Sequence, residues 1–264
     1  MEERRSSAGS RAVEVRDNVV VKRQEPGASR KERLRTLAGR KVGLETGLFT
    51  VPDVLSYDDA RGEIVFERLQ LTGLRVALTD PVGGMEMAGG AAQVLAAIHG
   101  RMELAEAAPG VTGPTGTGGH RELVPLHGDF GIANVLYNPP TARIAVIDWS
   151  NAGWTGVDAD LGAPETDVAV FVMSLFHRRL FEGTRVARRH DAARHFLATY
   201  AAAGPYGLDL VLLRQVVART TPAFVRLARL LKGNIRSLAY RHGVVDLSWF
   251  LRRLSHDGLT SHTG

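Results

Sequence analysis

The stretch His127–Asp148, HGDFGIANVLYNPPTARIAVID, gathers several chemically committed residues into one short segment. Asp129 and Asn134 lie five positions apart without helical periodicity between them, and the apolar run at residues 144–147 leads into Asp148. The Pro-Pro pair between Asn134 and this run predicts a turn, so the order is loop, strand, turn, strand and acid. Two short antiparallel strands would return the chain to its start and place Asp148 beside Asn134.

These three polar side chains form the minimum set for phosphoryl transfer. Asp129 is an acid that can accept a hydroxyl proton, and Asn134 and Asp148 can both hold Mg²⁺, a hard cation that prefers oxygen ligands. Phosphoryl transfer depends mainly on positioning and on charge neutralisation. Taken singly, each aspartate is more typical of a turn or a cap, so the interpretation depends on the combination and its spacing.

Composition limits the class of protein. The chain has 264 residues, of which 44% are hydrophobic and 23% charged, which predicts a real core in one large domain or in two lobes that share a cleft. The absence of cysteine excludes disulfides and thiolate zinc sites. The start, MEERRSSAGSR, lacks the apolar segment of a secretory signal, and no apolar run approaches a membrane span. We therefore expect a cytoplasmic protein without a transmembrane segment.

Charge is distributed unevenly along the chain. Residues 171–255 contain fifteen Arg or Lys and four Asp or Glu, a net charge of +11 within a total of +5. This basic third favours an anionic, neutral or macromolecular substrate, or contact with an anionic surface, over a polycationic substrate. The alternative is that these arginines form solvated helix faces remote from any cleft. Asp158, Asp160 and Glu165 lie close to Asp148 in sequence and would allow a small acidic site. No nucleic-acid reading motif is present.

The residues near the N-terminus predict two strands. Residues 11–23 alternate valine with charge and then form a β-branched run, with a turn at Asp17-Asn18. Lys22 closes the second strand. A strand lysine is most often a solvated edge residue, but nucleotide-dependent phosphoryl transfer needs a fixed cation on the α and β phosphates. Ser6–Ser10, SSAGS, lies where a phosphate-covering turn would sit, with too few residues before it for a full extra strand.

A helix is predicted to follow, from Ala28 to about Leu48. Ser29 is a candidate N-cap, and Glu32 three positions later completes a capping-box pattern. The apolar face of this helix is expected to contain Leu34, Leu37, Ala38, Val42 and Leu44.

Two glutamates of this helix are candidates to pair with the strand lysine. Glu32 and Glu45 can each turn toward Lys22, although either one alone is equally explained as a cap or an exposed helix charge. Residues 54–55 and 64–66 read as further short strands around a turn. Together these segments predict a small α+β lobe that ends at about residue 69.

The second half of the chain is predicted to be mostly helical. The Gly-rich patches at 81–90 and 108–120 bracket a helix at 91–102, and the second patch lacks the features of a phosphate loop, which predicts a flexible connection. His99 near the end of that helix is more typical of packing or capping than of a base. Later helices are expected at residues 167–182, 186–203, 208–232 with a kink at Pro222, and 245–255.

HGDFGIANVLY followed by IAVIDW resembles the signature of the aminoglycoside phosphotransferase-like kinases, a branch of the protein-kinase-like fold that includes choline, homoserine and macrolide kinases. More loosely, the resemblance extends from Val13 to about Leu175 through VVVKR, VPDVL, IVFERL, LAAIH and GAPETDVA. It implies an α+β, two-lobed protein-kinase-like fold. Residues 1–69 would form a small, β-rich, truncated nucleotide-binding lobe with one main helix. Residues 70–264 would form a mostly helical lobe with its catalytic loop at 127–134.

The resemblance implies a set of ATP contacts. Lys22 would hold the α and β phosphates, and Glu32, with Glu45 as second choice, would pair with it from the helix. Glu67 and Leu69 would present backbone groups of the hinge to adenine.

The resemblance also implies the roles of the loop residues. Asp129 would be the catalytic base for an acceptor hydroxyl, and Asn134 and Asp148 would be the ligands of Mg²⁺. His127 would support the loop, and Asp167 would organise it without taking part in the chemistry. The implied cofactors are therefore ATP and Mg²⁺.

The implied reaction is the ATP-dependent phosphorylation of a hydroxyl on a small molecule, such as a sugar, an amino alcohol or a secondary metabolite or antibiotic. An alternative is a kinase of a glycoconjugate, lipid-linked or macromolecular acceptor. A further alternative is a pseudokinase-like nucleotide-binding module, because the phosphate-covering loop is unrecognisable in this sequence.

Overall fold

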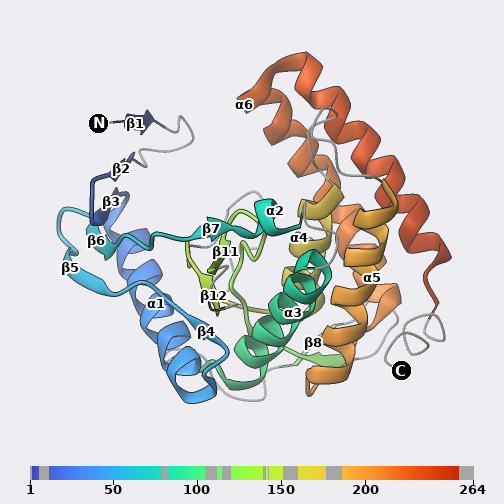
Figure 1. The fold of residues 1–264 in the computed structure, drawn as a ribbon, viewed down its shortest axis with the longest axis horizontal. Helices are drawn as coiled ribbons and strands as arrows, with labels where there is room; N and C mark the ends of the chain where they lie inside the picture. Colours follow the sequence, from blue (N-terminus) through green and yellow to red (C-terminus); the bar gives the residue numbers. More distant parts are fainter. Residues whose placement is uncertain are drawn as a thin grey trace.

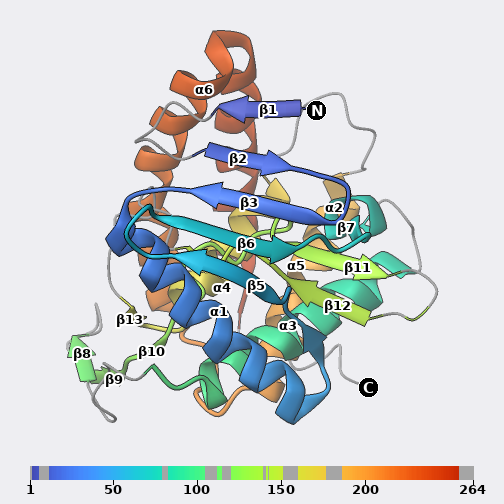
Figure 2. The ribbon, with the colours of Figure 1, turned by 90° about the vertical axis from the view of Figure 1, so that its left-hand side faces the viewer.

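The computed structural model describes residues 2–5, 12–78, 83–104, 112–114, 120–138, 141, 143–150, 160–176 and 186–255. A small lobe built on a β-sheet lies at one end of the molecule, and helices make up most of the remainder (Figures 1 and 2). This arrangement confirms the predicted α+β, two-lobed fold. The SSAGS stretch and Asp158 lie outside the described residues.

The small lobe contains a five-stranded antiparallel sheet in the order β1-β2-β3-β6-β5. The two strands expected from residues 11–23 are present, and their register pairs Val13 with Lys22. A further strand precedes them, which corrects the expectation that too few residues were available for one. The strands are β1 (Glu2–Arg5), β2 (Ala12–Val15), β3 (Val19–Arg23), β5 (Val54–Asp58) and β6 (Glu63–Glu67).

The main helix of the small lobe, α1 (Pro26–Thr46), begins earlier than predicted. Pro26 occupies the first helical turn, where its missing N–H costs nothing, and Glu25 is the N-cap residue. The predicted capping box is therefore wrong. Ser29 is buried within the helix, and the side chain of Glu32 is used elsewhere. Gly47 ends the helix in a left-handed conformation, with φ of 67°.

The buried face of α1 differs from the predicted one. Leu34, Leu37 and Leu44 are 38%, 43% and 75% exposed, whereas Val42 is buried as expected. The side of the helix that faces the protein is largely polar or small. It consists of Ser29, Glu32, Arg35, Thr36, Gly39, Val42 and Gly43. The periodicity of leucine misled the prediction because this helix buries functional and small residues against the site.

A second sheet carries the hairpin that the opening stretch predicted. Strand β11 (Val135–Asn138) pairs antiparallel with β12 (Arg143–Val146), and the register joins Val135 to Val146. The four strands lie in the order β4-β12-β11-β7, with β4 (Phe49–Thr50) parallel to β12 and β7 (Thr72–Gly73) antiparallel to β11. Strand β4 belongs to the first 69 residues, so it links the two lobes.

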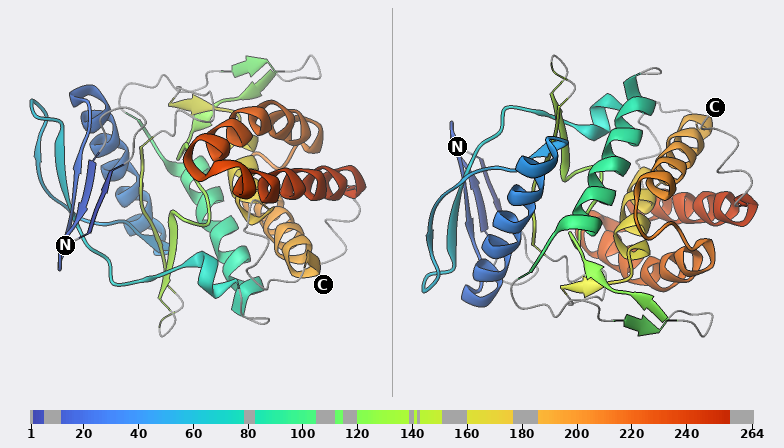
Figure 3. Two further views of the ribbon diagram at one scale, coloured as in Figure 1. Left: turned by 90° about the horizontal axis from the view of Figure 1, so that it is seen from above. Right: turned by 90° about the horizontal axis from the view of Figure 1, so that it is seen from below.

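The helical lobe begins with α3 (Gly83–Arg101), which includes most of the first Gly-rich patch. Small residues in this patch allow close helix packing. A Cβ at Gly89 would lie 2.7 Å from Nε2 of His195, and one at Gly90 would lie 2.8 Å from Cδ1 of Ile144. The other long helices are α4 (Glu165–Phe176), α5 (Val186–Ala203) and α6 (Leu210–Arg253). Helix α5 packs against α3, and α6 packs against α4 (Figure 3).

Helix α6 is assigned as one helix across the break that the sequence predicted after residue 232. It nevertheless folds back on itself, as Figure 1 shows. The guanidinium of Arg214 donates to the carbonyl of Leu254 at 2.7 Å, 40 residues away, whereas a straight helix of that length would span about 60 Å. Among the described residues, no helix is long and apolar enough to cross a membrane.

The remaining elements are short. They are α2 (Leu74–Ala77), β8 (Thr112–Pro114), β9 (His120–Glu122), β10 (Val124–Pro125) and β13 (Leu161–Gly162). Strands β8 and β9 form a hairpin within the second Gly-rich patch, most of which lies outside the described residues. Strands β10 and β13 pair directly before the catalytic loop and before α4, respectively.

Candidate active site

The loop predicted to be catalytic is held by hydrogen bonds to its backbone. The amides of His127 and Gly128 donate to the two carboxylate oxygens of Asp167 at 2.6 and 2.9 Å. Gly128 has a φ of 85°, which a residue with a Cβ rarely adopts. Burial opposes ionisation of Asp167, but the hydrogen bond and charge of His99, together with His127 and the Gly128 amide, hold the pKa of Asp167 below its usual range. Asp167, in the first turn of α4, therefore fixes the backbone at the start of the loop.

His99 belongs to this buried network and is a packing residue, as its position predicted. Its Nε2 lies 3.2 Å from Asp167 and its Nδ1 lies 2.7 Å from the hydroxyl of Tyr200. The side chains of His99 and Asp167 have no solvent exposure. Three helices, α3, α4 and α5, thus converge on the carboxylate that positions the loop.

The imidazole of His127 joins the loop to the end of β12. Its Nε2 donates to the carbonyl of Ile147 at 3.2 Å, and its Nδ1 accepts from the amide of Asp129 at 3.3 Å. This pattern requires the neutral ring with the proton on Nε2. Complete burial is the main cause that lowers the pKa of His127 to about 4, so the neutral form persists at physiological pH. His127 therefore supports the loop and is not a proton carrier.

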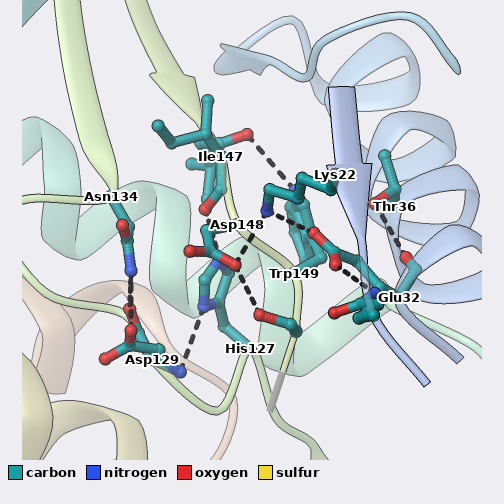
Figure 4. A network of polar contacts seen from close by, with 12 residues as sticks. Lys22, Glu32, Thr36, His127, Asp129, Asn134, Ile147, Asp148 and Trp149 are labelled. Atoms are coloured by element: carbon teal, nitrogen blue, oxygen red, sulfur yellow. Dashed lines mark hydrogen bonds and ion pairs between the residues drawn. The ribbon is translucent and has the colours of Figure 1, made fainter. Parts of the chain in front are cut away.

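Asp129 and Asn134 face each other across the loop (Figure 4). The Nδ2 of Asn134 donates to both the carbonyl and the carboxylate of Asp129 at 2.9 Å. The carbonyl of Asn134 accepts from the amide of Ile147 at 2.9 Å. Asp148 comes directly after Ile147 in the chain and has a φ of 60°, a strained value for a residue other than glycine. The hairpin thus brings Asp148 back to the loop, as the spacing predicted.

Lys22 reaches the same site from the small lobe. Its Nζ lies 2.5 Å from Oε1 of Glu32 and 3.0 Å from Oδ1 of Asp148. Gln24 donates to the other oxygen of Glu32 at 2.8 Å, which fixes that carboxylate. The solvated-edge interpretation of this lysine is wrong, since Lys22 is 7% exposed. Figure 4 shows the two ion pairs that Lys22 makes, one with Glu32 and one with Asp148.

Glu45, the second candidate partner, does not meet this lysine. Its side chain is 46% exposed and lies 3.9 Å from Lys41 on the outer surface of α1. Glu45 is thirteen residues after Glu32 along the helix, well beyond the buried end that approaches β3. The choice that the sequence left open is therefore decided in favour of Glu32.

A cavity of about 340 Å³ lies between the two sheets and opens beside Lys22 and Asp148. The register of the small sheet places one face of β2, β3 and β6 over it, and the hairpin closes it from the other lobe. Both predicted hinge residues, Glu67 and Leu69, line it. The amides of Glu67 and Arg68 already donate to the carbonyls of Asp53 and Asn18, so these two N–H groups are not available to a ligand. The apolar walls are Val13, Val15, Val20, Pro52, Phe66, Leu136, Ile147 and Trp149.

The donor set beside this cavity suits a small, hard cation. The side-chain amide of Asn134 donates both of these hydrogen bonds from its nitrogen, so its oxygen is the end that can accept a cation. Asp148 adds a carboxylate from the adjoining strand end. Within the described residues no three His, Cys, Asp or Glu side chains cluster as a self-sufficient metal site. An amide and one carboxylate fit Mg²⁺ that is shared with phosphate oxygens better than a metal held by protein alone.

Two nearby acids are occupied elsewhere, which corrects the expected acidic site. Asp160 contacts Lys31 at 3.1 Å and Arg35 at 3.3 Å. Glu165 is buried, and one of its oxygens accepts from the amide of Asp209 at 2.9 Å.

Two residues of the site were not singled out from the sequence. Trp149 is 1% exposed and its ring lies 4.6 Å from that of His127, centroid to centroid. Ser150 donates to Oδ1 of Asp148. Their only signal in the sequence was their position directly after Asp148. Neither residue type predicts such contacts without the fold.

The sequence matches one family model. Residues 102–206 match the phosphotransferase enzyme family, a segment that contains the catalytic loop, the hairpin and α4. No curated protein matches the sequence.

Solved structures of kinases share the fold. A choline/ethanolamine kinase family protein from Mesorhizobium loti aligns with a TM-score of 0.56 and 12% identity, over 99% of this chain and 92% of that one. Glucosamine kinase in complex with glucosamine, ADP and inorganic phosphate aligns with a TM-score of 0.60 and 16% identity, over 93% and 76%. The chain has the protein-kinase-like fold of these kinases. An aminoglycoside phosphotransferase from Streptomyces rimosus aligns with a TM-score of 0.53 and 16% identity, over 84% of this chain and 92% of that one.

The match of residues 102–206 to the phosphotransferase enzyme family supports a phosphotransferase. One of the similar structures contains ADP. At 12 to 16% identity the structures establish the fold and leave the acceptor open.

Proposed function

We propose that this protein transfers the γ-phosphoryl group of ATP to a hydroxyl group of a small molecule. The observation that carries the proposal is that two sets of side chains meet where the lobes join, with Lys22, Glu32 and Asp148 lining one cavity. Lys22 and Glu32 come from the small lobe, and Asp129, Asn134 and Asp148 come from the loop and hairpin of the other. Fixed cation, acid, amide and acid are the groups that phosphoryl transfer between oxygens requires.

The nucleotide is expected to bind with its base in the apolar cavity. The walls contributed by β2, β3 and β6 on one side and by Leu136 and Ile147 on the other would enclose a flat aromatic ring. The backbone of the segment from Glu67 to Leu69 would supply the polar contacts at the inner edge. Lys22 would then contact the α and β phosphates, and Glu32 would keep the ammonium in place.

Asn134 and Asp148 would hold Mg²⁺, which neutralises phosphate charge as the transfer proceeds. Asp129 would accept the proton of the acceptor hydroxyl. The hydroxyl oxygen of the acceptor would form a bond to the γ phosphorus while the bond from that phosphorus to the bridging oxygen of ADP breaks. The hydrogen bonds from Asn134 orient the carboxylate of Asp129 for that proton. The amide of Asp129 is fixed by His127.

The acceptor is expected to be a sugar, an amino alcohol or a secondary metabolite or antibiotic, and not a polycation. Between Leu210 and Val245, helix α6 has seven Arg or Lys and no Asp or Glu. Its bend lies at the same end of the molecule as β1 and β2 (Figures 1 and 2). Such a charge repels a polycation and attracts an anionic acceptor, and it does not disfavour a neutral one.

The same charge favours a second candidate, a kinase whose acceptor lies on an anionic surface or macromolecule. A basic helix would steer the enzyme to a lipid-linked or glycoconjugate acceptor. This candidate predicts that activity depends on anionic vesicles and falls as salt increases, because exposed charges are screened.

The test is ADP release in the presence of Mg-ATP with a panel of acceptors. The panel should include glucosamine, choline, ethanolamine, aminoglycosides and a neutral sugar, each with and without anionic vesicles. ADP formation that depends on one soluble acceptor supports the first candidate, and dependence on vesicles supports the second. If Mg-ATP produces no ADP and no rise in melting temperature, a binding module or another function replaces both, because a ligand of the native state must raise its stability.

A further inference from the structure

Arg35 is a buried cation in α1 whose contacts lie in the other lobe. It is 1% exposed. Its Nη2 donates to the carbonyl of Leu126, and its Nη1 donates to Oδ1 of Asp160 at 3.3 Å. Burying a guanidinium carries a large desolvation penalty, which is offset only when its N–H groups find well-placed acceptors. The two acceptors belong to the segments that carry β10 and β13.

The carbonyl that Arg35 contacts begins the catalytic loop. Leu126 directly precedes His127, and its own amide donates to the carbonyl of Asp160 at 3.0 Å. The next two amides, of His127 and Gly128, donate to Asp167. Three consecutive residues are therefore fixed, with α1 holding the carbonyl on one side and α4 holding the amides on the other.

The same helix fixes the lysine of the small lobe. Glu32 lies three residues before Arg35, about 4.5 Å along the helix axis, and it forms the ion pair with Lys22. One rigid turn of α1 thus contacts Lys22 through Glu32 and the catalytic loop through Arg35.

We propose that Arg35 is a positioning residue, which sets the catalytic loop and hence Asp129 relative to the Lys22–Glu32 pair. The proposal rests on the phosphotransferase function proposed above. Arg35 acts through the peptide of Leu126 and touches neither nucleotide nor acceptor. Displacement of a reacting group by about 1 Å costs roughly 100-fold in rate, so a modest shift of this peptide is expected to reduce turnover.

Arginine is required at this position because two acceptors lie on different segments. Its planar fork presents separate nitrogens to the carbonyl of Leu126 and to Asp160. Lysine would keep the charge and supply one point of contact. Arg35→Lys therefore separates the fork from the charge, and Asp160→Asn removes one acceptor charge while Arg35 stays in place.

The experiment compares Arg35→Lys, Asp160→Asn and wild type, with Arg30→Lys as the matched control on the exposed side of α1. In Arg35→Lys we expect kcat for ADP formation to fall about 10- to 100-fold, with Mg-ATP affinity changed less than about threefold. In Asp160→Asn we expect a smaller fall in kcat, and in Arg30→Lys we expect the wild-type kcat. An unchanged kcat in folded Arg35→Lys would overturn the proposal. So would a loss of Mg-ATP affinity equal to the loss of kcat, because the effect would then be collapse of the nucleotide site.

Amide hydrogen exchange gives a readout that does not need turnover. In Arg35→Lys, peptides that cover residues 126–129 should exchange at least about tenfold faster, while peptides from α5 should keep their wild-type rates. If wild type forms no ADP with any acceptor, the proposed function fails and this exchange still decides the role of Arg35. Wild-type exchange in the loop of Arg35→Lys would overturn the positioning role whatever the activity.

Discussion

The indole of Trp149 packs against Gly39 of α1, in the space that a side chain at that position would occupy. A Cβ at Gly39 would overlap the six-membered ring of Trp149, which is 1% exposed and also contacts the rings of Phe49 and His127. Trp149, the residue directly after Asp148, therefore lies against the helix that bears Glu32. The two lobes are joined at this point by close packing as well as by charge.

Gly39→Ala should destabilise the protein. Although alanine favours a helix, the added methyl group has to displace a buried ring, which costs about 1 to 3 kcal/mol. Urea unfolding would measure the loss. Gly27→Ala in the same helix is the control, since nothing lies within 4 Å of its Cβ, and it should be neutral or stabilising by less than about 1 kcal/mol. Equal effects of the two substitutions would contradict the packing argument.

Asp129→Ala should abolish turnover and leave the nucleotide site intact. We expect ADP formation to fall by roughly 10² to 10⁴-fold, because the acceptor hydroxyl loses its base, while Mg-ATP affinity changes little. Coupled ADP release and calorimetric titration measure the two quantities. Asp191→Ala, an aspartate of α5 with 55% side-chain exposure, should match wild type. Turnover at the wild-type level in Asp129→Ala would remove the catalytic-base assignment.

Asp148→Asn should weaken the binding of Mg-ATP itself. A charge-assisted contact contributes about 1.5 to 3 kcal/mol, so the dissociation constant should rise about tenfold or more. Titration of Mg-ATP against the variant measures the change. ATP titrated with EDTA should show a much smaller difference between the two proteins. Identical Mg-ATP affinity in variant and wild type would exclude the metal role.

The buried imidazole of His127 should make stability depend on pH. Its pKa is lowered by burial to about 4, whereas an unfolded histidine has a pKa near 6.5. The unfolded chain therefore binds more protons between these values, so this contribution is complete above about pH 6.5 and is lost as pH falls toward 4. Between pH 7 and pH 5 the free energy of unfolding should fall by about 2 kcal/mol from this group.

Urea unfolding of wild type and His127→Asn at pH 7 and pH 5 tests this expectation, and the variant should lose correspondingly less stability. If the variant does not fold, ¹⁵N NMR of the wild-type ring gives the answer directly. A charged His127 ring at pH 5.5 would contradict the predicted shift.

The two sides of α1 should respond differently to truncation. Val42 is 1% exposed and Leu44 is 75% exposed, although the leucine pattern predicted both to be buried. Val42→Ala should cost about 2 kcal/mol, and Leu44→Ala should stay within about 0.5 kcal/mol of wild type. Thermal or urea unfolding of the two variants measures the stability that each has lost. A larger cost at Leu44 would mean that the outer face of α1 is covered.

Sequence spacing predicted the hairpin and its chemistry because both are local. Residue spacing, a Pro-Pro turn and an apolar strand predicted that Asp148 returns beside Asn134, and in the structure Ile147, the residue before Asp148, pairs with Asn134. The β-strand of Lys22 and the helix of Glu32 also followed from short-range pattern. The expected catalytic, nucleotide and metal roles stay predictions until the variants above are measured.

What the sequence alone determined is therefore the local elements and the chemical groups that they carry, from which the reaction class was predicted. Only the tertiary structure decided that Glu32 and not Glu45 meets Lys22, that α1 turns leucines outward, and that Arg35 reaches the loop. The physical reason is that a helix with polar residues on two faces can be oriented in more than one way by its own periodicity. Contacts from segments distant in the chain select the orientation. Lys22 and Asp160 provide two of these contacts, because they pair with the opposite charges of Glu32 and Arg35. Trp149 provides the third, because its ring leaves no room for a side chain at position 39.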